Sequence, residues 1–171
     1  MIGYNSDPAV REKGGLMRTR TIALAVVTLF VVVAVCLAAD DAFMGTWKLN
    51  EAKSKVMPGQ AKNQTVVYSA EDGSVKLAID GVDASSKPFH SEWTGKFDGK
   101  DYPITGDPEN DMRALTRVNQ NTLRVTEKKG GKITVTGRIV VAADGKSRTV
   151  TTTSTDANGK KTTSTRFYDK Q

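Results

Sequence analysis

Apolar and polar residues alternate with a period of two along most of the chain after residue 40. The clearest segment is 132–142, where one face carries the row Ile133, Val135, Gly137, Ile139 and Val141. The other face of this segment carries Thr134, Thr136, Arg138 and Val140. Segments 122–126, 149–153 and 162–168 alternate in the same way. Because successive side chains of a strand point to opposite faces, this period predicts half-buried β-strands.

Turn-forming pairs separate the alternating segments. Asp-Gly or Asn-Gly stands at residues 72–73, 80–81, 98–99, 144–145 and 158–159. These residues tolerate the positive φ that tight hairpin turns require. The punctuation predicts short strands near residues 44–50, 63–70, 73–79, 87–97, 101–105, 111–119, 121–128, 132–142, 146–155 and 160–169. Only residues 50–60 do not alternate, and we expect a loop or one helical turn there.

The fold class that this pattern predicts is all-β. Many consecutive hairpins favour an up-and-down antiparallel barrel of about eight to ten strands over a sandwich, because closing the sheet removes its exposed edges. We expect residues 40–171 to form this barrel, after an N-terminal signal helix.

An uncharged apolar run, residues 22–39, differs from everything that follows it. It comes after a short positive segment, residues 17–20, and it ends in small residues. This is the pattern of a secretory signal peptide, with cleavage after Ala38. We therefore expect residues 1–39 to be an N-terminal extension plus signal peptide, and the protein to be exported to the periplasm or the cell exterior.

Two alternatives to a cleaved signal stay open. The run of residues 22–39 is just long enough to anchor the chain in a membrane, and Cys36 allows a lipoprotein. The start of translation is also open, because Met17 begins the signal pattern and residues 1–16 add nothing to it.

Composition limits the chemistry that the chain can perform. There is one histidine, His90, and one cysteine, Cys36. A Cys/His zinc site needs three or four ligands, and a catalytic triad would depend on the single histidine. His90 and Glu92 share a strand face, but nothing nearby in sequence supplies a nucleophile. The carboxylates of residues 107–111 lack calcium-loop spacing, so we expect no enzyme, no cofactor and no metal.

Charge adds little about partners. The formal net charge is +6, and loss of residues 1–38 lowers it to +4. The basic segment 128–132 suits an anionic surface, whereas an exported protein is not expected to meet nucleic acid. We expect a monomer that touches a membrane only through an uncleaved signal segment.

Motifs at both ends of the predicted barrel resemble a known superfamily. The first strand reads Ala42-Phe43-Met44-Gly45-Thr46-Trp47-Lys48-Leu49, and the last reads Thr165-Arg166-Phe167-Tyr168-Asp169-Lys170. Gly-x-Trp on a first strand resembles the calycins, which include lipocalins and fatty-acid-binding proteins. The Thr-Arg-x-Tyr-x-Lys segment resembles the last strand of fatty-acid-binding proteins. The chain is also similar to small exported lipocalin-like proteins of bacteria, and it lacks room for the helical lid of fatty-acid-binding proteins.

The resemblance implies two roles for one arginine. Arg166 either closes the barrel with Gly45 and Trp47, stacking on the indole ring, or it points inward with Tyr168 to bind a ligand carboxylate. We expect Trp93 to be a core residue or part of the ligand wall.

The second carboxylate-binding arginine of fatty-acid-binding proteins has no clear counterpart. Arg124, Arg138 and Arg148 are candidates, and we expect each of them on the outer face. The resemblance implies a non-enzymatic binding protein for a small hydrophobic or amphipathic ligand, such as a fatty acid or lipid. The alternative is a structural or protein-interaction barrel of the cell envelope without a ligand cavity, and interior volume discriminates the two.

Overall fold

Ten antiparallel strands make up the chain from residue 45 to residue 170. The computed structural model describes residues 41–156 and 158–171, so the predicted signal helix lies outside the described residues. The strands are β1 (Gly45–Lys55), β2 (Lys62–Glu71), β3 (Ser74–Val82), β4 (Pro88–Gly95), β5 (Tyr102–Thr105), β6 (Met112–Asn119), β7 (Thr122–Lys129), β8 (Lys132–Val141), β9 (Ser147–Thr155) and β10 (Lys161–Lys170). Each strand pairs with the next, as expected for an up-and-down meander.

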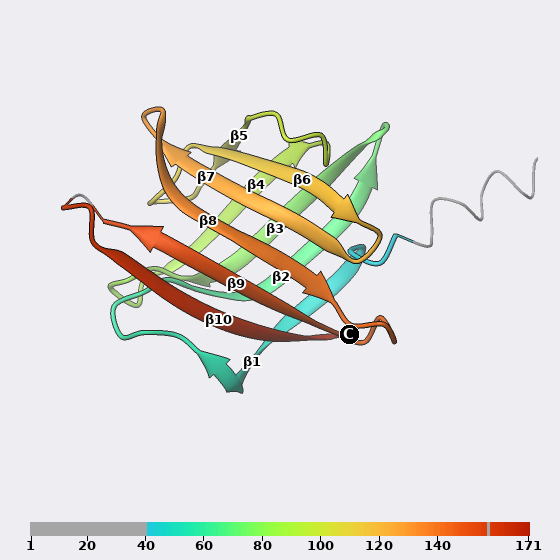
Figure 1. Cartoon of the computed structure of the whole chain (residues 1–171), viewed down its shortest axis with the longest axis horizontal. Coiled ribbons are helices and arrows are strands. Elements are labelled where there is room, and N and C mark those ends of the chain that lie inside the picture. Colours follow the sequence, from blue (N-terminus) through green and yellow to red (C-terminus); the bar gives the residue numbers. More distant parts are fainter. Residues whose placement is uncertain (1–40, 157) are drawn as a thin grey trace, which may run out of the picture. The chain divides into compact units, whose positions relative to one another are not determined.

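The sheet closes because β1 pairs with both β2 and β10. Figure 1 shows β1 beside β10, with the remaining strands following one another around the barrel. The predicted all-β fold class, a closed up-and-down antiparallel barrel, is confirmed. Among the described residues, no helix is long and apolar enough to cross a membrane.

The segment 50–60 departs from the sequence expectation, because β1 continues to Lys55. The pairing of β1 with β10 shifts register between Asn50 and Lys55. Side chains satisfy the backbone at this irregularity: Ser54 Oγ donates to the Asn50 carbonyl oxygen at 2.7 Å and accepts from Phe167 N at 2.9 Å. A bulged strand does not keep a period of two, which explains why the alternation failed here.

A second register shift changes the inner face of β8. The pairing of β7 with β8 slips between Glu127 and Lys128. Ile133 is therefore 54% exposed, although Ile139 and Val141 of the same predicted row are buried. A one-residue slip moves a side chain to the opposite face of a sheet, so Ile133 leaves the inner row.

One end of the barrel is plugged by aromatic side chains. Phe43 and Trp47 are fully buried, and Trp47 Nε1 donates a 2.8 Å hydrogen bond to the Phe43 carbonyl oxygen. The Phe43 ring meets Phe97 edge-on with centroids 5.9 Å apart. Arg117 lies over both phenylalanine rings and forms an ion pair with Asp41. We call this the closed end.

Candidate functional site

A cavity of about 460 Å³ lies between the strands. It reaches from the inner residues near the closed end to an opposite end that we call the mouth. The mouth is bordered by the β1–β2 link at residues 57–61, by the β5–β6 loop at residues 107–110, and by Asp156 and Lys160 beside β9 and β10. The volume falls within the range of about 300–1,000 Å³ that is usual for small-molecule pockets.

The cavity lining is apolar on strands β2 to β4 (the apolar wall) and largely polar on strands β9 and β10 (the polar wall), with a mixed set of side chains from β6 to β8 between them. Strands β2 to β4 contribute the apolar side chains Val66, Leu77, Ile79 and Phe89. Strands β9 and β10 contribute Thr152, Ser154, Thr162, Arg166 and Tyr168. The Thr-rich tail thus turns alternate residues inward, because side chains two apart on a strand share a face. The arrangement suits a molecule with both an apolar and a polar part.

Arg166 is fixed on the polar wall by three hydrogen bonds. Its Nη1 donates to Thr152 Oγ1 at 3.0 Å and to Ser164 Oγ at 2.8 Å. Its Nη2 donates to the carbonyl oxygen of Ala61 at 3.0 Å, in the link that borders the mouth. Its Nε is buried without a partner. No carboxylate within residues 41–156 and 158–171 lies within 4.0 Å of this guanidinium.

Tyr168 lies on the same face as Arg166, two residues nearer the closed end. Its hydroxyl donates a 3.0 Å hydrogen bond to the Asn63 carbonyl oxygen. The side chain is buried, and this burial raises the pKa of the phenol above its ordinary value of 10.0. Tyr168 is therefore a neutral hydrogen-bonding group at physiological pH.

Arg148 is the cation at the bottom of the cavity. Its guanidinium carbon lies 4.8, 5.3 and 4.7 Å from the ring centres of Trp47, Tyr68 and Tyr168. The residue is only 3% exposed, and its Nε and Nη1 have no hydrogen-bond partner among the described residues. The expectation that Arg148 lies on the outer face is wrong, because it occupies an inward position two residues before Val150.

The predicted stack of Arg166 on Trp47 is replaced by another arrangement. The cations over the Trp47 ring are Arg148 at 4.8 Å and the Lys170 ammonium at 5.2 Å. Arg166 pairs with Val150 in the sheet and extends towards the mouth, too far along β10 to reach Trp47. Gly45 does lie at the closed end, with a φ of 101° beside the Lys170 side chain.

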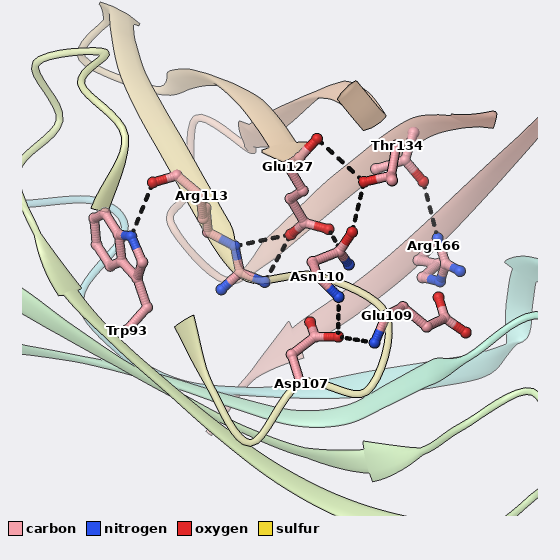
Figure 2. A network of polar contacts seen from close by, with 9 residues as sticks. Trp93, Asp107, Glu109, Asn110, Arg113, Glu127, Thr134 and Arg166 are labelled. Carbon is pink, nitrogen blue, oxygen red and sulfur yellow. Dashed lines mark hydrogen bonds and ion pairs between the residues drawn. The ribbon is translucent and has the colours of Figure 1, made fainter. Parts of the chain in front are cut away.

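A third inward arginine, Arg113 on β6, was missed at the sequence level. It is 4% exposed; its Nε donates to Glu127 Oε1 at 2.8 Å, and its Nη2 forms an ion pair with the same oxygen at 2.7 Å. Asn110 Nδ2 donates to the other Glu127 oxygen at 3.1 Å, and Thr134 Oγ1 donates to Asn110 Oδ1 (Figure 2). The signal was present in the sequence, since Arg113 and Leu115 share a strand face. The network connects the β5–β6 loop at the mouth to strands β7 and β8.

Trp93 stands behind this network and not on the cavity surface. Its Nε1 donates a 3.0 Å hydrogen bond to the Arg113 carbonyl oxygen, as Figure 2 shows. Its ring meets Tyr102 edge-on with centroids 5.9 Å apart. Trp93 is 1% exposed and does not line the cavity. Its place is in the core, the first of the two roles expected for it.

Two carboxylates from the β5–β6 loop sit at the mouth. Asp107 Oδ1 accepts from the backbone nitrogens of Glu109 and Asn110 at 2.8 and 3.0 Å. The Glu109 side chain extends towards Arg166 (Figure 2). Burial raises the pKa of Glu109 above 4.5, and neighbouring Asp107 and Glu127 raise it further, whereas Arg166 lowers it. Within the described part of the chain, no group of three metal-ligating side chains comes together.

The remaining candidates lie on the outer face of the barrel. Arg124 and Arg138 are exposed and oppose each other on β7 and β8. His90 Nδ1 lies 2.7 Å from Asp80 and its Nε2 lies 3.6 Å from Glu92, with the imidazole 55% exposed. The hydrogen bond to Asp80 raises the pKa of His90. These residues have no contact with the cavity.

Comparison with known proteins adds no family assignment. The chain matches no protein-family profile and no curated protein. The closed ten-strand barrel is consistent with a calycin-like fold.

Proposed function

We propose that the protein is a non-enzymatic, lipocalin-like binding protein that holds a small amphipathic acid, such as a fatty acid, inside the barrel. The apolar wall would bury the hydrocarbon part of the ligand, and the polar wall would orient its acidic head. Burial of apolar surface supplies the affinity, while a few polar groups fix the orientation.

The observation that carries the proposal is the state of Arg166. A guanidinium has five N–H donors, of which three are paired here with Thr152, Ser164 and Ala61. The Nε donor and one Nη2 donor remain without an acceptor among the described residues. Since an unpaired buried donor is costly, a ligand carboxylate at Arg166 is favoured. A planar guanidinium also matches a carboxylate geometrically.

The alternative is a structural or interaction barrel of the envelope with a filled interior. The 460 Å³ cavity favours the binding function over this alternative. A well-packed core has few voids larger than a water molecule. A purely structural barrel would be more stable with this space filled by side chains and without a half-buried arginine such as Arg166 in its wall.

A binding assay with a fluorescent fatty acid tests the proposal. Arg166→Ala is expected to weaken binding by at least about tenfold, because the charge-assisted hydrogen bonds to the head group are lost. Tyr168→Phe is expected to weaken it several-fold. Arg138→Ala, which removes an exposed arginine, is the matched control and leaves the affinity unchanged. Unchanged affinity in folded Arg166 and Tyr168 variants would refute the proposal.

The proposed site of action is outside the cytoplasm. Support comes from the signal-like pattern of residues 17–39. Fractionation of the host cells tests it: the barrel is expected in the periplasm or medium, lacking residues 1–38. Full-length chain in the membrane fraction would favour the anchor formed by residues 22–39.

A further inference from the structure

Two of the arginines that line the cavity have no carboxylate within ion-pair distance among the described residues. Three buried or half-buried arginines line it: Arg113, Arg148 and Arg166. Only Arg113 has a carboxylate partner within 4.0 Å in the described residues, namely Glu127. Arg166 has the Glu109 carboxylate nearby but beyond 4.0 Å, and Arg148 has no carboxylate of the described residues within that distance. A buried charge without a counter-charge is costly.

These two arginines lie at different depths in the cavity. Tyr168 pairs with Arg148, and Arg166 pairs with Val150, so the two arginines start two residue pairs apart on neighbouring strands. Their side chains then diverge. Arg166 reaches Thr152 and Ser164 towards the mouth, whereas Arg148 turns towards Trp47 at the closed end. The two guanidinium groups therefore face different parts of the cavity, one near the mouth and one near the closed end.

Arg148 has unused hydrogen-bonding capacity as well as charge. Aromatic rings of Trp47, Tyr68 and Tyr168 surround it and supply cation–π attraction. A ring face accepts no strong hydrogen bond, and no side-chain or backbone acceptor among the described residues pairs with this guanidinium. Arg148 is only 3% exposed, and it lines the cavity.

We propose that the ligand is a molecule with two acidic groups separated by an apolar spacer, one group bound at Arg166 and the second at Arg148. This inference rests on the proposed binding function and narrows its ligand class from a monoacid to a long-chain diacid. The second acidic group would lie at the bottom of the cavity, and the spacer would lie against Val66, Leu77 and Ile79. Each acidic group would supply the close carboxylate partner that Arg166 and Arg148 lack among the described residues.

Calorimetric titration with matched acids tests this inference. The protein is purified as its host processes it, with bound lipid removed. The probes are dodecanedioate, its monomethyl ester and dodecanoate, which share one spacer length and differ in the second acidic group. Dodecanedioate is expected to bind at least about tenfold more tightly than the other two, since a charge-assisted hydrogen bond is worth that factor. Equal or weaker binding of dodecanedioate would overturn the inference.

Two variants test whether Arg148 is responsible for the preference for dodecanedioate. Arg148→Gln is expected to reduce the ratio of dodecanedioate to dodecanoate affinity to about one, whereas Arg138→Gln on the outer face keeps the wild-type ratio. An unchanged ratio in folded Arg148→Gln would overturn the inference. If Arg148→Gln does not fold, a shorter diacid replaces it. Octanedioate is expected to lose the preference because its two carboxylates lie closer together than those of dodecanedioate, and an equal preference would refute the assignment.

The outcomes separate this inference from the proposed function. Dodecanoate binding that depends on Arg166, without any preference for the diacid, refutes the diacid and leaves the binding function intact. Absence of binding for all three acids refutes both.

Discussion

The Arg148 guanidinium lies 4.8 Å from the centre of the Trp47 ring, although the two residues come from β9 and β1, which are not neighbours. Strand β10 lies between β1 and β9 in the sheet, so the two side chains meet inside the barrel, across the inner face of β10. It connects the aromatic plug of the closed end, through Trp47, with the cavity lining, through Arg148.

The contact between Arg148 and Trp47 should appear as a coupling free energy between the two side chains when protein stability is measured. In a double-mutant cycle with Arg148→Met and Trp47→Phe, we expect a favourable coupling of about 0.5–2 kcal/mol, because the cation–π contact is desolvated. Chemical denaturation of the four proteins measures it. A parallel cycle with Arg138→Met should give no coupling. Coupling near zero in the first cycle would contradict the stacking account.

The buried ion pair between Arg113 and Glu127 should be sensitive to the loss of one partner. Glu127→Gln is expected to lower the free energy of unfolding by about 3–5 kcal/mol, since it leaves a 4% exposed arginine without a counter-charge. Glu51→Gln breaks the exposed pair with Lys62 and should change stability by less than about 1 kcal/mol. Denaturation curves for both variants measure the two losses in the free energy of unfolding. Similar losses in the two would argue against a buried-charge penalty.

Backbone conformation at Gly45 provides a separate stability prediction. Its φ of 101° is unfavourable for an L-residue, and an added Cβ would approach Lys170 Cε to 3.1 Å. Gly45→Ala is therefore expected to cost about 1–3 kcal/mol. The melting temperature relative to Ala52→Gly, a change at an exposed position of the same strand, measures the effect. A neutral Gly45→Ala would show that the first strand relaxes freely at this end.

The sequence predicted the strands well, because a period of two and Asp-Gly turns are local signals. It failed at residues 50–55 and at Ile133, where register shifts break the period. A register shift depends on the partner strand, which a single strand's pattern does not contain.

Site prediction from the sequence was partial for a similar reason. The Arg166 and Tyr168 pair could be placed on one face from spacing alone. The inward orientation of Arg148 and the pairing of Arg113 with Glu127 depend on which face of each strand turns inward and on residues far apart in the chain. The cation over Trp47 was assigned to the wrong arginine because two arginines, on adjacent strands, were both available.

Glu109 should make ligand affinity depend on pH. Its pKa is raised, so as pH rises through that pKa the folded protein gains a negative charge beside Arg166, which repels an anionic head group. With dodecanesulfonate, which stays ionised, affinity is expected to rise as the pH falls through the raised pKa of Glu109. The rise should be smaller in Glu109→Gln, which is neutral throughout. Identical pH profiles for the two proteins would exclude a role for Glu109.

The same raised pKa has a consequence for folding. The native state holds the Glu109 proton more tightly than the unfolded chain does, so this contribution to stability is full below pH 4.5 and is lost as pH rises through the raised pKa. Glu109→Gln should therefore gain stability over wild type at neutral pH and lose that advantage in acid. Denaturant titrations at several pH values measure the difference.

Native mass spectrometry of the protein purified from its own host tests the central claim most directly. A small organic acid is expected to accompany the wild-type barrel, to persist in Arg138→Gln, and to be lost from Arg166→Gln. Ligand-free protein in all three preparations, or an adduct that is equally abundant in Arg166→Gln, would contradict the account of a barrel that binds an amphipathic acid through Arg166.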